Sequence, residues 1–262
     1  MNELTSIAPA PIRGRRRAAN PLLSLAVAEA RLFLRDPVTV LLAMALPALI
    51  LAGLAAVPAL REPDDIFGGL RFTDYFAPAL LAINIAVLGL QNLPTGLATY
   101  REKGVLRRFS ATPMRPSAVL VVQLVINLVT AAVGTALMLM VAVLVLDVPA
   151  PRHPIGFVLT FLLGTSAVFA LGLVIAALVP RARLATGIGT VAFMLTQFFS
   201  GVYLPKFLLP DVVVRIGEVV PPATGAFQAA WLGNGPAPSQ LVVMAVIAVT
   251  ATAVAARFFR WE

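Results

Sequence analysis

The side chains best suited to bind a ligand are carboxamides and hydroxyls that recur inside three long apolar segments. In the second segment Asn84, Gln91, Asn92 and Thr95 lie near one face of a helix. The third and fifth segments carry similar stripes at steps of three and four residues. Such stripes offer a few hydrogen bonds in an apolar wall, as a path for an amphiphile requires. We predict that this path is lined by Asn84, Gln91, Thr95, Gln123, Asn127, Thr190, Gln197 and Phe198.

The same stripes are also compatible with helix packing. Small residues let helices approach closely, and amides bond across helix interfaces in membranes. For any single residue packing is the simpler interpretation. For the combined faces of the second and fifth segments both interpretations stay open.

Several kinds of chemistry are excluded by what the sequence lacks. It has no cysteine and a single histidine, His153, and no charged residue lies deep within an apolar segment. We therefore predict no catalytic residue, no metal site and no ion-coupled relay. The G-x-x-x-x-G-K-[ST] phosphate loop is also absent. We expect no cofactor in this chain, so that any ATP and Mg²⁺ would be bound by another subunit.

A polar segment from residue 100 to 116 separates the second and third apolar runs. It carries Arg101, Lys103, Arg107, Arg108 and Arg115 against one acid, Glu102. Positive charge of this density favours the cytoplasmic face of a membrane. The alternative is a basic cluster that only binds anionic lipid, but Gly104 and Pro113 are typical of a helix with a defined start and stop.

The elements that position these residues are predicted to be membrane-spanning helices. The chain is 60% hydrophobic and 12% charged, with a mean hydropathy of +0.93, far from the composition of soluble domains. We predict an all-α integral membrane protein with a flexible basic tail over 1–21 and one transmembrane domain over 22–262. Within this domain 22–35 is an interfacial helix. Six segments are long enough to span, at 38–60, 75–98, 117–146, 155–179, 185–204 and 240–256.

The distribution of basic residues predicts the orientation. Six spans place fifteen of the twenty Lys and Arg on the side of the 100–116 segment, which puts both termini in the cytoplasm. On the other side, 205–239 reads as two short re-entrant helices separated by Pro221-Pro222; an exposed loop is the alternative. Because the basic clusters flank apolar runs, we expect contact with membrane lipids and no binding of nucleic acid.

Three motifs resemble those of ABC-2 type permeases, the membrane subunits of ATP-driven exporters. Arg101-Glu102-x-Gly104-x-Leu106-x-Arg108 with Ala111-Thr112-Pro113 is similar to the cytoplasmic-loop signature of that family. Phe199-Ser200-Gly201-Val202-Tyr203-Leu204-Pro205 resembles its motif at the end of the fifth span, and Phe33-Leu34-Arg35-Asp36-Pro37 is a weaker match. The resemblance covers almost the whole chain.

The resemblance implies a multi-pass protein of the bacterial inner membrane that pairs with a second permease, expected to be identical, and with two ABC ATPase subunits. The 100–116 segment would be the coupling helix, with ATPase-coupling residues Arg101, Glu102, Gly104, Arg107, Arg108 and Pro113. Arg107 departs from the family pattern, which often has an acid there.

The expected function is export of a hydrophobic small molecule, antibiotic or lipid, most similar to the daunorubicin and multidrug-resistance permeases. The chain itself is expected not to be an enzyme. Two alternatives stay open: export of a lipid-linked polysaccharide, and a membrane scaffold or assembly factor that transports nothing.

Overall fold

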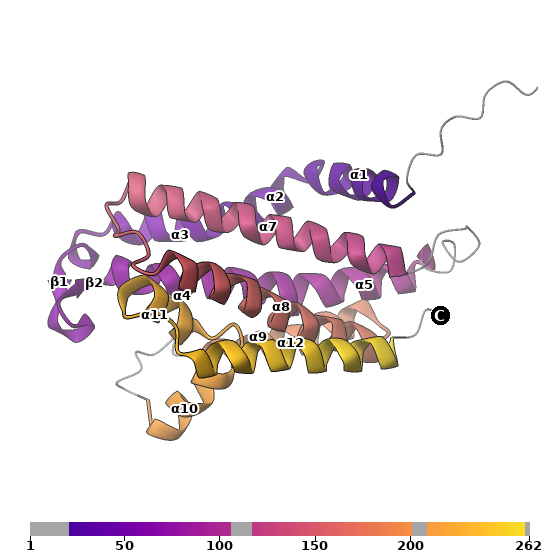
Figure 1. Cartoon of the computed structure of the whole chain (residues 1–262). Helices are drawn as coiled ribbons and strands as arrows, with labels where there is room; N and C mark the ends of the chain where they lie inside the picture. The colour runs from indigo at the N-terminus through magenta and orange to yellow at the C-terminus, as the bar shows by residue number, and fades with distance from the viewer. Residues whose placement is uncertain (1–20, 106–116, 201–208, 260–262) are drawn as a thin grey trace, which may run out of the picture.

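The computed structural model describes residues 21–105, 117–200 and 209–259, which form a bundle of helices with a small hairpin at one end (Figure 1). In this part of the chain four helices are long and apolar enough to cross a membrane, Phe72–Glu102, Ala118–Leu144, Pro154–Leu178 and Pro238–Phe258. The prediction of an all-α membrane protein is confirmed.

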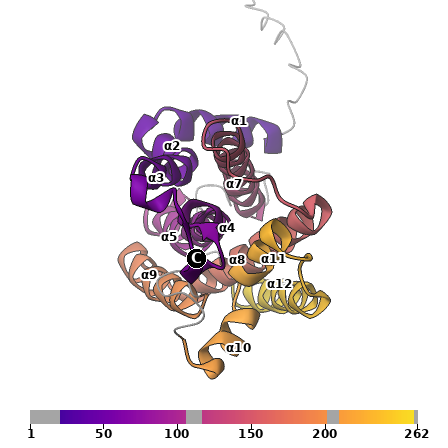
Figure 2. The same ribbon diagram turned by 90° about the vertical axis from the view of Figure 1, so that its left-hand side faces the viewer.

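The Phe72–Glu102 helix is the central element. Its most apolar stretch is 72% buried, against 17–50% for the other three long helices. It consists of α4 (Phe72–Ala86), the π-helix η3 (Val87–Asn92) and α5 (Leu93–Glu102). Figure 2 shows its neighbours around it, which are α3 (Leu46–Ala55), α7 (Ser117–Leu144), α8 (Pro154–Leu178) and α9 (Ala182–Phe199). The helix that carries Asn84, Gln91 and Thr95 of the predicted path is thus placed where the other helices can surround it.

The first predicted span is interrupted. Instead of one helix over 38–60, the chain forms α2 (Pro37–Met44) and α3, followed by a 3-10 turn, η1 (Pro58–Leu60). The break falls at Ala45, although Ala45 N–H still donates to Leu41 O at 2.8 Å. Pro47 lies in the first turn of α3, where an N–H would have no partner within that helix. In a continuous helix over 38–60 the same missing N–H would remove a hydrogen bond.

The remaining predicted spans correspond to single helices. α7 and α8 match 117–146 and 155–179 within two residues, and α12 (Pro238–Phe258) is slightly longer than 240–256. α9 has 18 residues and begins before Arg183, while 201–204 of its predicted range lies outside the described residues. The number six for the spans stays a prediction, because α2, α3 and α9 are shorter than the four long helices.

Two short helices follow α9, as predicted for this region. α10 (Asp211–Val219) and α11 (Thr224–Leu232) flank Pro221-Pro222, whose peptide bond is cis. Phe227 and Trp231 of α11 are fully buried, and Trp231 Nε1 donates to Pro149 O at 2.7 Å. Far from being an exposed loop, α11 belongs to the core, against α4 and α8.

A small hairpin between α3 and α4 was not predicted. β1 (Pro63–Asp64) and β2 (Leu70–Arg71) pair antiparallel around η2 (Asp65–Phe67). At the end of the hairpin, Arg71 Nε and Nη2 donate to the two carboxylate oxygens of Asp74, each at 2.9 Å. Arg71 Nη2 also donates to Asp147 O at 2.6 Å. The hydrogen bond to Asp147 O joins the start of α4 to the segment that follows α7.

The helix ends gather in two groups (Figure 1). The ends of α5 and α8 meet the start of α9 at one end of the bundle, because Arg101 donates to Val179 O and Glu102 accepts from Ala182 N–H. The segments joined by Arg71 and Trp231 lie at the other end. This grouping agrees with the predicted alternation of the chain across a bilayer.

Candidate functional site

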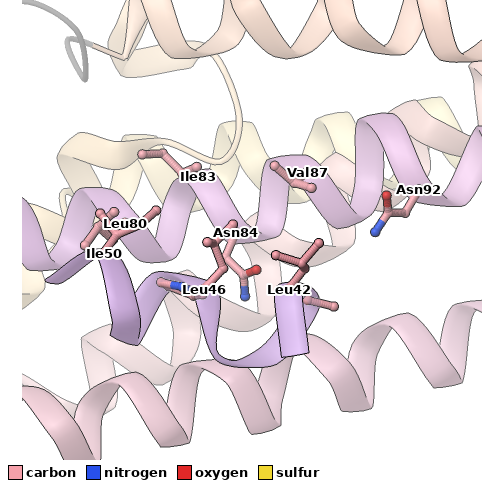
Figure 3. A pocket seen from close by; sticks show the side chains of 10 residues that line it. Leu42, Leu46, Ile50, Leu80, Ile83, Asn84, Val87 and Asn92 are labelled. Carbon is pink, nitrogen blue, oxygen red and sulfur yellow. The ribbon is translucent and has the colours of Figure 1, made fainter. Parts of the chain in front are cut away.

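An apolar cavity of about 330 Å³ lies between α2, α3 and the central helix. In Figure 3 the Asn84 side chain points from α4 toward the break between α2 and α3. Asn84 is 7% exposed, and its Nδ2 has no hydrogen-bond partner among the described residues. We call this space the apolar cavity; its lining is Leu42, Ala43, Leu46, Pro47, Ile50, Leu80, Ile83, Asn84, Val87 and Asn92.

A second cavity of about 400 Å³ has a different character. Helix α1 (Pro21–Leu34), η3 with α5, α7 and α9 surround it, and carboxamides and hydroxyls supply most of its polar surface. None of the described residues that line it is charged. We call it the polar cavity; its lining is Phe33, Leu88, Gln91, Asn92, Thr95, Gly96, Gln123, Ile126, Asn127, Thr130 and Thr186.

Only part of the polar lining is free to bind a ligand. Asn127 Nδ2 donates to Gln123 O at 2.9 Å, and Thr130 Oγ1 donates to Ile126 O at 2.8 Å. In contrast, the side chains of Gln91 and Asn92 make no hydrogen bond within the described part of the chain. These two adjacent carboxamides therefore keep all their donors and acceptors unused within the described part of the chain.

The π-helix η3 explains how Asn92 comes to line both cavities. A π-helical turn accommodates one residue more than an α-helical turn, and each residue rotates the face by about 100°. Asn92 therefore takes the angular position relative to Asn84 that Gln91 would have in a regular helix. Accordingly Asn84 and Asn92 line the apolar cavity, whereas Gln91 lines only the polar one.

A hydrogen-bonded cluster adjoins the polar cavity through Gln123. Tyr100 Oη donates to Glu29 Oε2 at 2.6 Å, and Gln123 Nε2 donates to the same oxygen at 3.1 Å. Gln123 also lies 3.1 Å from Tyr100 Oη. Three helices, α1, α5 and α7, are thus joined through one carboxylate.

Glu29→Ala is expected to loosen α1. The substitution removes the shared acceptor of Tyr100 and Gln123, and hydrogen bonds to a charged group stabilise by about 1.5–3 kcal/mol. Amide hydrogen exchange over 21–34 should accelerate about tenfold or more, while Arg31→Ala, on the exposed side of α1, should leave it unchanged. Equal exchange in Glu29→Ala and the unsubstituted chain would show that the cluster does not anchor the helix.

Five of the eight predicted path residues line the two cavities: Asn84, Gln91, Thr95, Gln123 and Asn127. The other three, all on α9, line neither. Gln197 is fully buried with both amide atoms unpartnered among the described residues, and Thr190 is half-buried. Phe198 is 42% exposed beside Val191.

Thr186 is the residue by which α9 reaches the polar cavity. Its hydroxyl lies 3.0 Å from Thr95 Oγ1. Thr186 stands four residues before Thr190 and continues the same stripe, so the periodicity could have identified it. Glu29 and Phe33 left no comparable signal, because nothing local indicates that α1 meets α7.

The predicted coupling residues that are described belong to the end of α5. Arg101 Nη1 donates to Ala176 O at 3.1 Å and to Val179 O at 3.3 Å, and its guanidinium lies over the Phe259 ring. Glu102 accepts from Ala182 N–H at 2.9 Å.

Gly104 follows the C-terminus of α5 with φ +65°, a conformation that suits glycine. Arg107, Arg108 and Pro113 lie outside the described residues. Because Arg101 and Glu102 have partners inside the chain, they attach the central helix to α8 and α9. Their contact with another subunit stays a prediction.

The arrangement suits the binding of uncharged polar groups. The described residues contain no group of three or more His, Asp or Glu that could hold a metal ion. Amides and hydroxyls in an apolar surrounding bind uncharged polar groups through hydrogen bonds.

Comparison with known protein families matches residues 21–230 to the family described as ABC-2 type transporter. The match begins where α1 begins and includes every residue that lines either cavity. A comparison with curated proteins finds no significant match.

Proposed function

Since the chain belongs to the ABC-2 type transporter family and is thereby a membrane permease component of an ABC transporter, we propose that it works as an exporter. In this proposal it moves a hydrophobic small molecule, antibiotic or lipid from the cytoplasm or inner leaflet to the outside. Such an activity would contribute to multidrug or antibiotic resistance.

The energy for transport is proposed to come from a separate ABC ATPase. The sequence has no phosphate-binding loop of its own, so ATP and Mg²⁺ would be bound by the partner. We propose a complex of two ATPase subunits and two copies of this chain.

The two cavities along the central helix carry the proposal. They offer an amphiphile an apolar wall with a small number of hydrogen-bonding groups, and both are lined by the central helix. If these amides served only helix packing, they would bond across the helix interfaces. The side chains of Gln91 and Asn92 bond to no other described residue, which favours ligand binding.

Coupling is proposed to run through the central helix. This helix is continuous from η3, beside the cavities, to Glu102, and the 100–116 segment follows it directly. A displacement of that segment by the ATPase would therefore move the walls of both cavities as one rigid element. Location in the bacterial inner membrane with both termini in the cytoplasm would place this end beside the ATPase.

Charge reversal in the 100–116 segment tests this proposal. In the chain purified from its native host, Arg107→Glu combined with Arg108→Glu is expected to reduce the co-purifying ATPase about tenfold or more, because like charges across an interface are repelled. The control is Arg215→Glu, an exposed residue of α10 at the opposite end of the bundle. An unsubstituted chain that carries no ATPase would instead indicate a scaffold.

A further inference from the structure

The apolar and polar cavities meet at Asn92 and together make one candidate site. Of the described residues, Asn92 alone lines both of them. The apolar cavity extends from Asn92 along α4 as far as Leu80, and the polar cavity extends along α5 as far as Gly96. A molecule that occupies both would lie lengthwise against the central helix.

The polar end of this site suits an uncharged group. Its described lining residues are amides, hydroxyls and apolar side chains, without a counter-ion for a charged ligand. The nearby carboxylate of Glu29 already accepts from Tyr100 and Gln123. An isolated charge would lose its hydration without compensation here. Gln91 and Asn92 can each donate and accept, so they match hydroxyls and amides.

The other end suits an apolar chain with one acceptor. Eight of the ten residues that line the apolar cavity are aliphatic or proline, and Asn84 contributes one unpartnered donor, Nδ2. Because Asn84 is 7% exposed, this donor has lost its hydration and would gain from an ester, ether or carbonyl oxygen. Leu42 and Leu46 line the same cavity and are 50% and 41% exposed, so the cavity opens toward the surface of α2 and α3.

We propose that the site binds an amphiphile with an uncharged, hydroxyl- or amide-bearing head in the polar cavity and an apolar tail, with one acceptor near Asn84, in the apolar cavity. This inference rests on the proposed function, which it narrows from amphiphiles in general to those with neutral heads. Anionic phospholipids and cationic drugs are thereby excluded as preferred ligands.

Photolabelling of the chain without ATPase, in phosphatidylcholine nanodiscs, tests the inference. Three probes share a dodecyl tail with a diazirine and differ in the head: glucoside, phosphate or trimethylammonium. The glucoside probe is expected to label Phe72–Glu102 at a concentration about tenfold lower than either charged probe. Equal labelling by all three, preference for a charged probe, or no specific labelling of the folded chain would overturn the inference.

Substitutions locate the head. Gln91→Leu with Asn92→Leu is expected to weaken glucoside labelling about tenfold, whereas Thr250→Val on α12, outside both linings, should not change it, since that hydroxyl already donates to Val246 O. Unchanged labelling in the double variant would contradict the placement of the head. Co-purification of an ATPase from the native host is measured separately. If the glucoside probe labels selectively but no ATPase co-purifies, the proposed function is refuted and this inference is not. If an ATPase co-purifies but labelling is not selective, only this inference is refuted.

Discussion

Gly189→Ala is expected to destabilise the protein strongly, whereas Gly187→Ala, two residues earlier on α9, is expected to be tolerated. A Cβ added to Gly189 would lie 2.1 Å from Leu90 O of η3. Around Gly187 no described atom other than those of its chain neighbours and its own helix backbone lies within 4 Å of the added Cβ. The two substitutions are chemically identical, so the difference between them isolates the contact with the central helix.

The physical reason is that backbone meets backbone at this point. Gly189 on α9 and Gly172 on α8 face the carbonyls of Leu90 and Gly89, and a Cβ at Gly172 would lie 1.9 Å from Gly89 O. Neither carbonyl can rotate away as a side chain would, so the helices must separate. Overpacking of this kind lowers the free energy of unfolding by about 3 kcal/mol. At Gly187 alanine meets no such contact and has a higher helix propensity than glycine.

Denaturant titration of the purified chain in detergent, followed by circular dichroism, measures the effect. Gly189→Ala and Gly172→Ala should both unfold at a clearly lower denaturant concentration than the unsubstituted chain, and Gly187→Ala at the same or a higher one. If Gly189→Ala and Gly187→Ala had the same midpoint, the close packing of η3 between α8 and α9 would be wrong.

Much of this architecture could be predicted because apolar runs and helical periodicity report directly on spanning helices. α7, α8 and α12 agree closely with the predicted ranges. The predicted stripes on the second and third segments meet for the same reason: Gln91, Thr95, Gln123 and Asn127 line one cavity. Regular spacing is sufficient wherever the helices are regular.

The predictions were incomplete where the helices are irregular or the contacts are distant. A π-helical turn has no compositional signal, so Asn92 could not be separated from Gln91 as the residue shared by both cavities. The second span was predicted to end at residue 98, with a separate coupling helix in the 100–116 segment, yet α5 continues to Glu102 and Arg101 bonds to the carbonyls of Ala176 and Val179. The stripe on α9 was assigned to the path as a whole, but among the described residues of α9 only Thr186 lines the apolar or the polar cavity, because α9 crosses the central helix near its own start.

The second large effect is expected for access to Asn92 in the assembled transporter. If the ATPase drives alternating exposure of the path, water should reach the junction of the two cavities in one nucleotide state and not in the other. The minor state of such an equilibrium is commonly populated at about 0.1–10%, so access should change about tenfold or more. Asn92 is well placed to report this, because it is exposed and lines both cavities.

Cysteine labelling provides the most direct test, and the chain contains no native cysteine to interfere. Asn92→Cys, co-purified with its ATPase in nanodiscs, is treated with a membrane-impermeant maleimide without nucleotide and after trapping with ATP and vanadate. Asp65→Cys, at the exposed hairpin, is the control and should react equally in both states. We expect the labelling rate of Asn92→Cys to change about tenfold between the states. An unchanged rate, while the bound ATPase hydrolyses ATP, would contradict an ATP-driven path along the central helix.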